Sequence, residues 1–208
     1  PSKELAEKIF PSFTHQLLLD HLFKQPDLLA SHEAAQQALV ALASDALDAE
    51  SEHFQNWLTG SLESAGDRLK ELIESRTETL DTFIEGLELE TDEEGKPAAA
   101  RSPREMVDEL VGLLQLPLKL SPEQARLLRD DAEKARALIA PMIESNLLSL
   151  MLKNQVFSVK RRLGDSLNIT FSDTASTDWD AAVAEIMAQV KAFIDARRDR
   201  FVRAEDGL

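Results

Sequence analysis

The chain has 208 residues and carries 38 acidic against 23 basic side chains, a net charge of −15. It contains no cysteine, which excludes disulfide frameworks, thiolate nucleophiles and cysteine-ligated zinc or iron–sulfur sites. Its 33 Leu and 26 Ala against 8 Ile and 8 Val favour helix over strand. We therefore predict an all-α fold, an irregular bundle of about six to eight helices with one long central apolar helix.

The first elements in chain order are two short predicted helices, over 3–10 and 12–24, which end at Pro11 and Pro26. From Ser31 onward, apolar residues recur every three or four positions as far as Leu87, the spacing of an amphipathic helix. Gly60 and Gly66 interrupt this stripe, and each glycine costs roughly 1 kcal/mol inside a helix. We expect a break or a sharp bend near 59–61, and hence a long helical hairpin within 1–90.

The polar, acidic stretch 91–102 contains Gly95 and Pro97 and is typical of a flexible linker. Ser102-Pro103-Arg104-Glu105 then begins a helix with a capping box, and Ser121-Pro122-Glu123-Gln124 repeats that signature. A helix is expected over about 122–139, where Pro141 can kink or break it. Residues 142–163 are the most apolar run of the chain and are predicted to form the central helix.

The segment 167–171 alternates apolar and polar residues. A single strand has no partner to pair with, so we predict an extended connector there. The last helix is expected to begin at Thr177-Asp178-Trp179-Asp180, and it has the cleanest apolar periodicity of the chain.

The charge is unevenly distributed. Residues 1–100 hold 21 acidic and 7 basic side chains, whereas residues 101–208 hold 17 and 16. This predicts an acidic helical half over 1–90, a flexible acidic linker over 91–102 and a near-neutral helical half over 103–208, either as one compact unit or as two closely packed subdomains. An acidic half repels phosphate backbones, so we predict no nucleic-acid partner.

Motifs for chemistry are few. A di-iron or di-manganese carboxylate site needs two Glu-x-x-His motifs and two further glutamates, and the chain has one such motif, Glu50-x-x-His53. Glu50 and His53 are therefore weak metal candidates. Phosphate-binding and dinucleotide-binding glycine motifs and a nucleophile elbow are missing from the sequence, so we predict no cofactor and an activity that is more plausibly non-enzymatic than enzymatic.

Two basic clusters end predicted helices: Lys160-Arg161-Arg162, and a later group that begins with Arg197 and Arg198. One interpretation is that these cations complement helix dipoles. The other is that the two ends lie together and bind an acidic partner or the acidic half of the chain. Trp57 and Trp179 are candidate partner-binding residues, together with Leu116, Leu118 and Leu120 as exposed apolar groups. Ordinary core packing is the alternative for all five.

These observations predict a non-catalytic helical module for protein–protein interaction or regulation, either free or as an accessory part of a larger assembly. The alternative is a helical metal-carboxylate protein or enzyme that uses Glu50 and His53. We expect a protein partner, which can be basic to suit the acidic half, and homo-oligomerisation stays open. No run approaches 18 uninterrupted apolar residues, so we predict no membrane span, and a start without a signal-peptide pattern predicts a cytoplasmic location.

Overall fold

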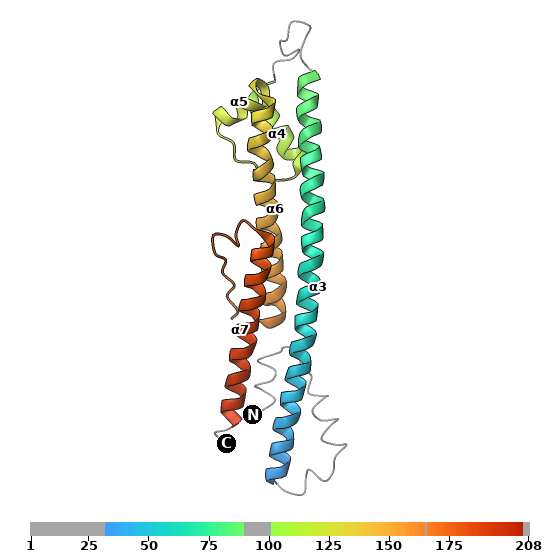
Figure 1. The fold of residues 1–208 in the computed structure, drawn as a ribbon. Coiled ribbons are helices and arrows are strands. Elements are labelled where there is room, and N and C mark those ends of the chain that lie inside the picture. Colours follow the sequence, from blue (N-terminus) through green and yellow to red (C-terminus); the bar gives the residue numbers. More distant parts are fainter. Residues whose placement is uncertain (1–31, 90–100, 165, 206–208) are drawn as a thin grey trace. The chain divides into compact units, whose positions relative to one another are not determined.

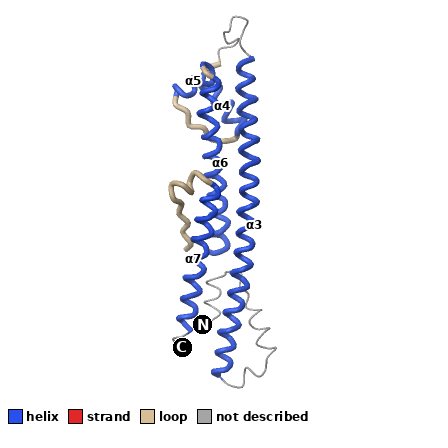
Figure 2. The backbone as a smooth tube through the Cα atoms, in the orientation of Figure 1, coloured by secondary structure: helices blue, strands red, loops and turns tan. Residues whose placement is uncertain are grey.

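The computed structural model describes residues 32–89, 101–164 and 166–205 (Figures 1 and 2). All regular secondary structure in these ranges is α-helical, and they contain no strand, which confirms the all-α prediction. Five helices occur there: α3 (His32–Leu89), α4 (Pro103–Leu114), α5 (Pro122–Asp130), α6 (Ala132–Leu163) and α7 (Trp179–Glu205). The short helices predicted over 3–10 and 12–24 and nearly all of the predicted linker lie outside the described residues.

The chain folds as two compact units. Among the described residues, unit 1 contains those up to Ser64 and from Lys153 onward, and unit 2 contains those between Ala65 and Leu152. Helices α3 and α6 therefore each contribute one segment to unit 1 and another to unit 2. The largest fully buried side chains are all aliphatic: leucine and isoleucine in both units, with valine in unit 1 as well. In unit 1 they are Leu58, Leu62, Val159, Leu163, Ile186 and Val190, and in unit 2 they are Leu80, Leu110, Leu114, Ile139 and Ile143.

Helix α3 runs without interruption from residue 32 to residue 89, so the predicted break near 59–61 is wrong and no hairpin turn lies within this range. Leu58 and Leu62, on either side of Gly60, are both buried. Burial of such a side chain contributes about 1.5–3 kcal/mol, which outweighs the roughly 1 kcal/mol that a helical glycine costs. Packing of the apolar face therefore overrides the weak local signal.

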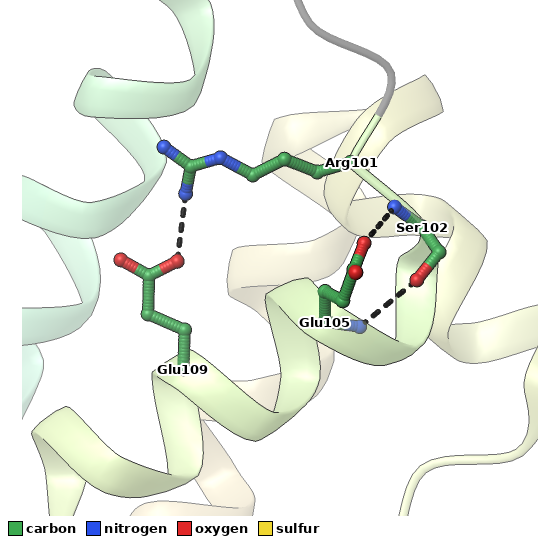
Figure 3. A network of polar contacts seen from close by, with 4 residues as sticks. All are labelled: Arg101, Ser102, Glu105 and Glu109. Carbon is green, nitrogen blue, oxygen red and sulfur yellow. Dashed lines mark hydrogen bonds and ion pairs between the residues drawn. The ribbon is translucent and has the colours of Figure 1, made fainter.

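Both predicted capping boxes are present. In α4 the Glu105 backbone N–H donates to Ser102 Oγ at 3.2 Å, and the Ser102 backbone N–H donates to Glu105 Oε2 at 2.8 Å (Figure 3). The same pair of bonds joins Ser121 and Gln124 at the start of α5. Each box satisfies donors that a helix start leaves without an intrahelical partner, so these two starts are determined locally.

The helix predicted over about 122–139 is divided at Asp131, which is a correction. Asp131 ends α5, and its carboxylate accepts the Lys134 backbone N–H at 3.1 Å at the start of α6. Aspartate is a preferred residue at a helix N-cap because its side chain can accept this bond. Pro141 does not break α6, which continues to Leu163.

Residues 167–172 form neither helix nor strand, which agrees with the connector predicted over 167–171, and Thr170 and Ser172 bond to side chains of α7. The Thr170 backbone N–H donates to Gln189 Oε1 at 3.0 Å, and Gln189 Nε2 donates to the Thr170 carbonyl at 2.7 Å. The Ser172 backbone N–H and hydroxyl both donate to the Glu185 carboxylate. Side chains of α7 therefore take the place of the neighbouring strand that this segment lacks.

The Ser172–Glu185 contact makes one pH-dependent contribution to stability. The Ser172 hydroxyl, followed by the Ser172 backbone N–H, lowers the pKa of Glu185 below its ordinary value of 4.5. A carboxyl whose pKa is lowered by folding stabilises the protein above its unfolded pKa, and this contribution disappears as the pH falls through the folded pKa. We expect Glu185→Gln to flatten the dependence of unfolding free energy on pH below about 4.5, as measured by urea unfolding at several pH values. Ser172→Ala, which keeps the backbone donor, is expected to flatten it only in part, and an unchanged profile in Glu185→Gln would contradict the assignment.

Candidate functional site

In unit 1, α3 and α6 pack against each other around Trp57. Ser61 Oγ on α3 donates to Gln155 Oε1 on α6 at 3.1 Å. The Arg162 guanidinium lies over the Trp57 ring at 3.8 Å from its centroid, an arrangement that is attractive because of the ring quadrupole. The Phe54 ring also contacts Trp57, with centroids 5.3 Å apart. Trp57 and Arg162, both predicted as partner-binding residues, therefore contact each other within the protein.

The outward side of α6 in unit 1 carries an exposed phenylalanine among cations. Phe157 is 68% exposed, and Lys153 and Arg161, one turn before and one turn after it, share its helix face and are exposed. Lys160 is half-buried. None of these three cations forms an ion pair with a carboxylate of the described ranges. We call Lys153, Phe157, Lys160 and Arg161 the α6 patch.

Sequence reasoning missed Phe157 because it assigned this residue to an apolar run. The available signal was the charge pattern: from Ser145 to Gly164 the chain has four cations and no carboxylate. Such a one-sided pattern around a phenylalanine is unusual for a chain with a net charge of −15.

Arg197 has an internal role at the end of α6. Its guanidinium donates to the Leu163 carbonyl at 3.4 Å and to the Ser166 hydroxyl, and lies 4.1 Å from the centre of the Phe193 ring. A cation at this carbonyl end is stabilising because the helix dipole is negative there. The end of α6 and this turn of α7 therefore lie together. The side chain of Arg198 is outside the described part of the chain.

The remaining predicted apolar partner-binding residues are covered to different degrees. Leu116 is buried, as the core-packing alternative expects, whereas Trp179, Leu118 and Leu120 are half-buried. Within the ranges described, the exposed large apolar side chains are instead Leu113, Leu150 and Phe157. Core packing determines which of these side chains are covered and which are exposed. Their local sequence does not, because all of them are apolar.

His53 is exposed on α3, and the side chain of Glu50 lies outside the described set. Among the side chains that are described, no three His, Asp or Glu gather in a way that could hold a metal ion. The Glu50/His53 pair therefore stays a prediction.

Unit 2 contains an open groove of about 530 Å³ between α3 and the middle and end of α4, with Arg101 just before α4 at its edge. Phe83, Leu87 and Leu113 provide its apolar lining, and Glu78, Glu109 and Arg101 its charged groups, beside Ser75, Thr79, Thr82 and Gly86. Arg101 forms an ion pair with Glu109 at 2.6 Å (Figure 3). Thr79 and Thr82 donate their hydroxyl protons to the carbonyls of Ser75 and Glu78. We call this the acidic groove, because two of its three charged residues are carboxylates.

A row of carboxylates follows one face of α3 in unit 2: Asp67, Glu71, Glu74, Glu78 and Glu85, all exposed. Their spacing of three, four and seven residues places them on one side of the helix. None of them pairs with a cation of the described residues, whereas Asp81 on the same helix binds Arg136 with oxygen–nitrogen distances of 2.6 and 2.8 Å. We call these five residues the acidic stripe.

Helix α6 is the one helix of the described ranges that is long and apolar enough to cross a membrane by length and composition. The core helix of a soluble protein passes the same test, so this finding leaves the predicted lack of a membrane span as a prediction.

No protein-family model, no curated protein and no solved structure matches this chain. The function is therefore argued from the surfaces described above.

Proposed function

We propose that this chain is a non-catalytic helical module that binds a basic protein partner, as an adaptor or as an accessory part of a larger assembly. The acidic stripe on α3 is the observation that carries this proposal. Its five carboxylates are exposed along one helix face and have no cationic partner in the described ranges.

The acidic stripe has an energetic cost for the isolated helix. Like charges three or four residues apart destabilise a helix by about 0.2–0.5 kcal/mol per pair. A partner that places lysine or arginine along the stripe would replace this repulsion with attraction. Complementary charge also steers association and suppresses wrong partners. The stripe is therefore better suited to recognition than to stabilising the isolated helix.

The test measures binding of a fluorescent, lysine-rich helical peptide by anisotropy. The triple variant Asp67→Asn, Glu71→Gln and Glu74→Gln removes three charges from the stripe. A matched control, Asp173→Asn with Glu123→Gln and Glu144→Gln, removes three exposed charges elsewhere. We expect the stripe variant to weaken binding by about tenfold, equivalent to about 1.4 kcal/mol, and the control to weaken it much less. Equal weakening in both would show that only net charge matters and would overturn the proposal.

The metal-carboxylate alternative is tested by a separate experiment. Elemental analysis of the purified protein that finds stoichiometric iron, manganese or zinc, lost in His53→Ala, would contradict a non-catalytic module without a metal.

A further inference from the structure

We propose that this chain binds a second copy of itself, with Phe157 of one copy inserted into the acidic groove of the other. This inference goes beyond the basic partner proposed above. The contact joins two surfaces of complementary chemistry. One is an exposed aromatic residue among cations, and the other is an apolar groove with carboxylates at its edge.

The first surface is the α6 patch. Phe157 exposes 68% of its surface, and full burial of a phenylalanine side chain contributes about 1.5–3 kcal/mol. A partner surface must be apolar where it meets the ring and acidic beside it, because Lys153 and Arg161 flank Phe157 by one turn on each side. These requirements define the chemistry of the acceptor.

The acidic groove of unit 2 meets both requirements. Its volume of about 530 Å³ accommodates an aromatic side chain, and Phe83, Leu87 and the half-exposed Leu113 form its apolar lining. Glu109 is bound to Arg101, whereas Glu78 has no ion pair within the described ranges. Glu78 is therefore the carboxylate that would receive Lys153 or Arg161, with Glu74 and Glu85 of the acidic stripe further along the same helix face.

Charge also decides which two surfaces meet. A two-fold contact of patch on patch would place the cations of one copy against those of the other, and groove on groove would do the same with carboxylates. Only patch in groove pairs opposite charges. A single patch-in-groove contact between two copies is heterologous and repeats from copy to copy unless a ring closes, whereas two reciprocal contacts give a two-fold dimer. The contact area of one aromatic side chain and its neighbours is small, so the association is weak and appears only at high protein concentration.

The test is sedimentation velocity over a concentration series reaching the high micromolar range. The wild-type protein is expected to show a weight-average mass that rises with concentration. Phe157→Ser removes the inserted side chain, and Gly86→Lys fills the groove. An added Cβ at Gly86 meets no atom within 4 Å, and lysine is a better helix former than glycine, so this variant keeps the fold. Each variant alone is expected to stay monomeric.

Mixing the two variants provides the decisive result. Phe157→Ser retains an intact groove, and Gly86→Lys retains an intact patch, so the mixture is expected to form a one-to-one dimer that grows no further. Leu150→Ser removes another half-exposed apolar residue of α6 and is expected to associate like the wild type. A wild-type protein that stays monomeric, a mixture that does not dimerise, or an equal loss in Leu150→Ser would each overturn the proposal. None of these measurements involves the basic peptide, so failure here and failure of the proposed function are distinguishable.

Discussion

Leu110→Ala is expected to lower the free energy of unfolding by about 2–5 kcal/mol, the range for truncation of a buried leucine. Leu110 lies on α4 and is completely buried in the core of unit 2. Alanine would leave a cavity that neighbours such as Met106 and Leu114, buried on the same helix, can fill only in part. Urea unfolding followed by far-UV circular dichroism, which reports helix in both units, measures the loss.

Leu113→Ala is the matched control, because it removes the same atoms from the same helix at a position that is 49% exposed. We expect a loss well below 1 kcal/mol there, as is usual for surface substitutions. Similar losses at Leu110 and Leu113 would contradict the assignment of the buried face of α4. A small loss of unfolding free energy in Leu113→Ala would agree with a Leu113 side chain that lines the acidic groove and not the core.

Arg197→Met is expected to lower the stability of unit 1 by about 1.5–3 kcal/mol, the range for hydrogen bonds that involve a charged group. The substitution removes the donors to the Leu163 carbonyl and the Ser166 hydroxyl. It keeps an unbranched apolar stem against Phe193. Both tryptophans, Trp57 and Trp179, belong to unit 1, so urea unfolding followed by tryptophan fluorescence reports the relevant unit.

Arg197→Lys separates the contribution of the positive charge from that of the guanidinium hydrogen-bond geometry. Lysine retains the positive charge near the end of α6, but its single ammonium group lacks the planar fork with which arginine bonds two acceptors. We therefore expect it to recover only part of the lost stability. Full recovery would mean that charge alone acts through the helix dipole, and no loss in Arg197→Met would refute the internal role of this residue.

Part of the fold follows from short segments of sequence. The capping boxes at Ser102 and Ser121 and the start of α7 next to Asp178 were all predictable. Each depends on bonds or backbone preferences within a few residues, such as the acceptance of the Ala181 backbone N–H by Asp178 at 2.7 Å. Such contacts are the same whatever the rest of the chain does.

The candidate sites were less predictable. The Lys160-Arg161-Arg162 cluster could be recognised in the sequence as a group of adjacent cations. In the structure its members differ, because Arg162 lies over the Trp57 ring whereas Arg161 is exposed. The acidic half of the chain was also visible, but not that five of its carboxylates share one exposed face. The three-, four- and seven-residue spacing of these carboxylates lies beyond the break predicted near 59–61 and was readable from the sequence, whereas their exposure depends on the tertiary packing of α3.

The sequence alone thus determined helical content, helix starts and the uneven distribution of charge, because composition, capping and periodicity act locally. Only the tertiary structure decided that α3 continues through Gly60, that Arg197 binds a carbonyl 34 residues earlier, and that Phe157 faces outward. Between Leu147 and Val159 the apolar residues of α6 are spread around most of the helix, so periodicity cannot distinguish an inward residue from an outward one there. Packing against α3 buries one side of α6 in unit 1, and the remaining side, with Phe157 and its cations, is left at the surface.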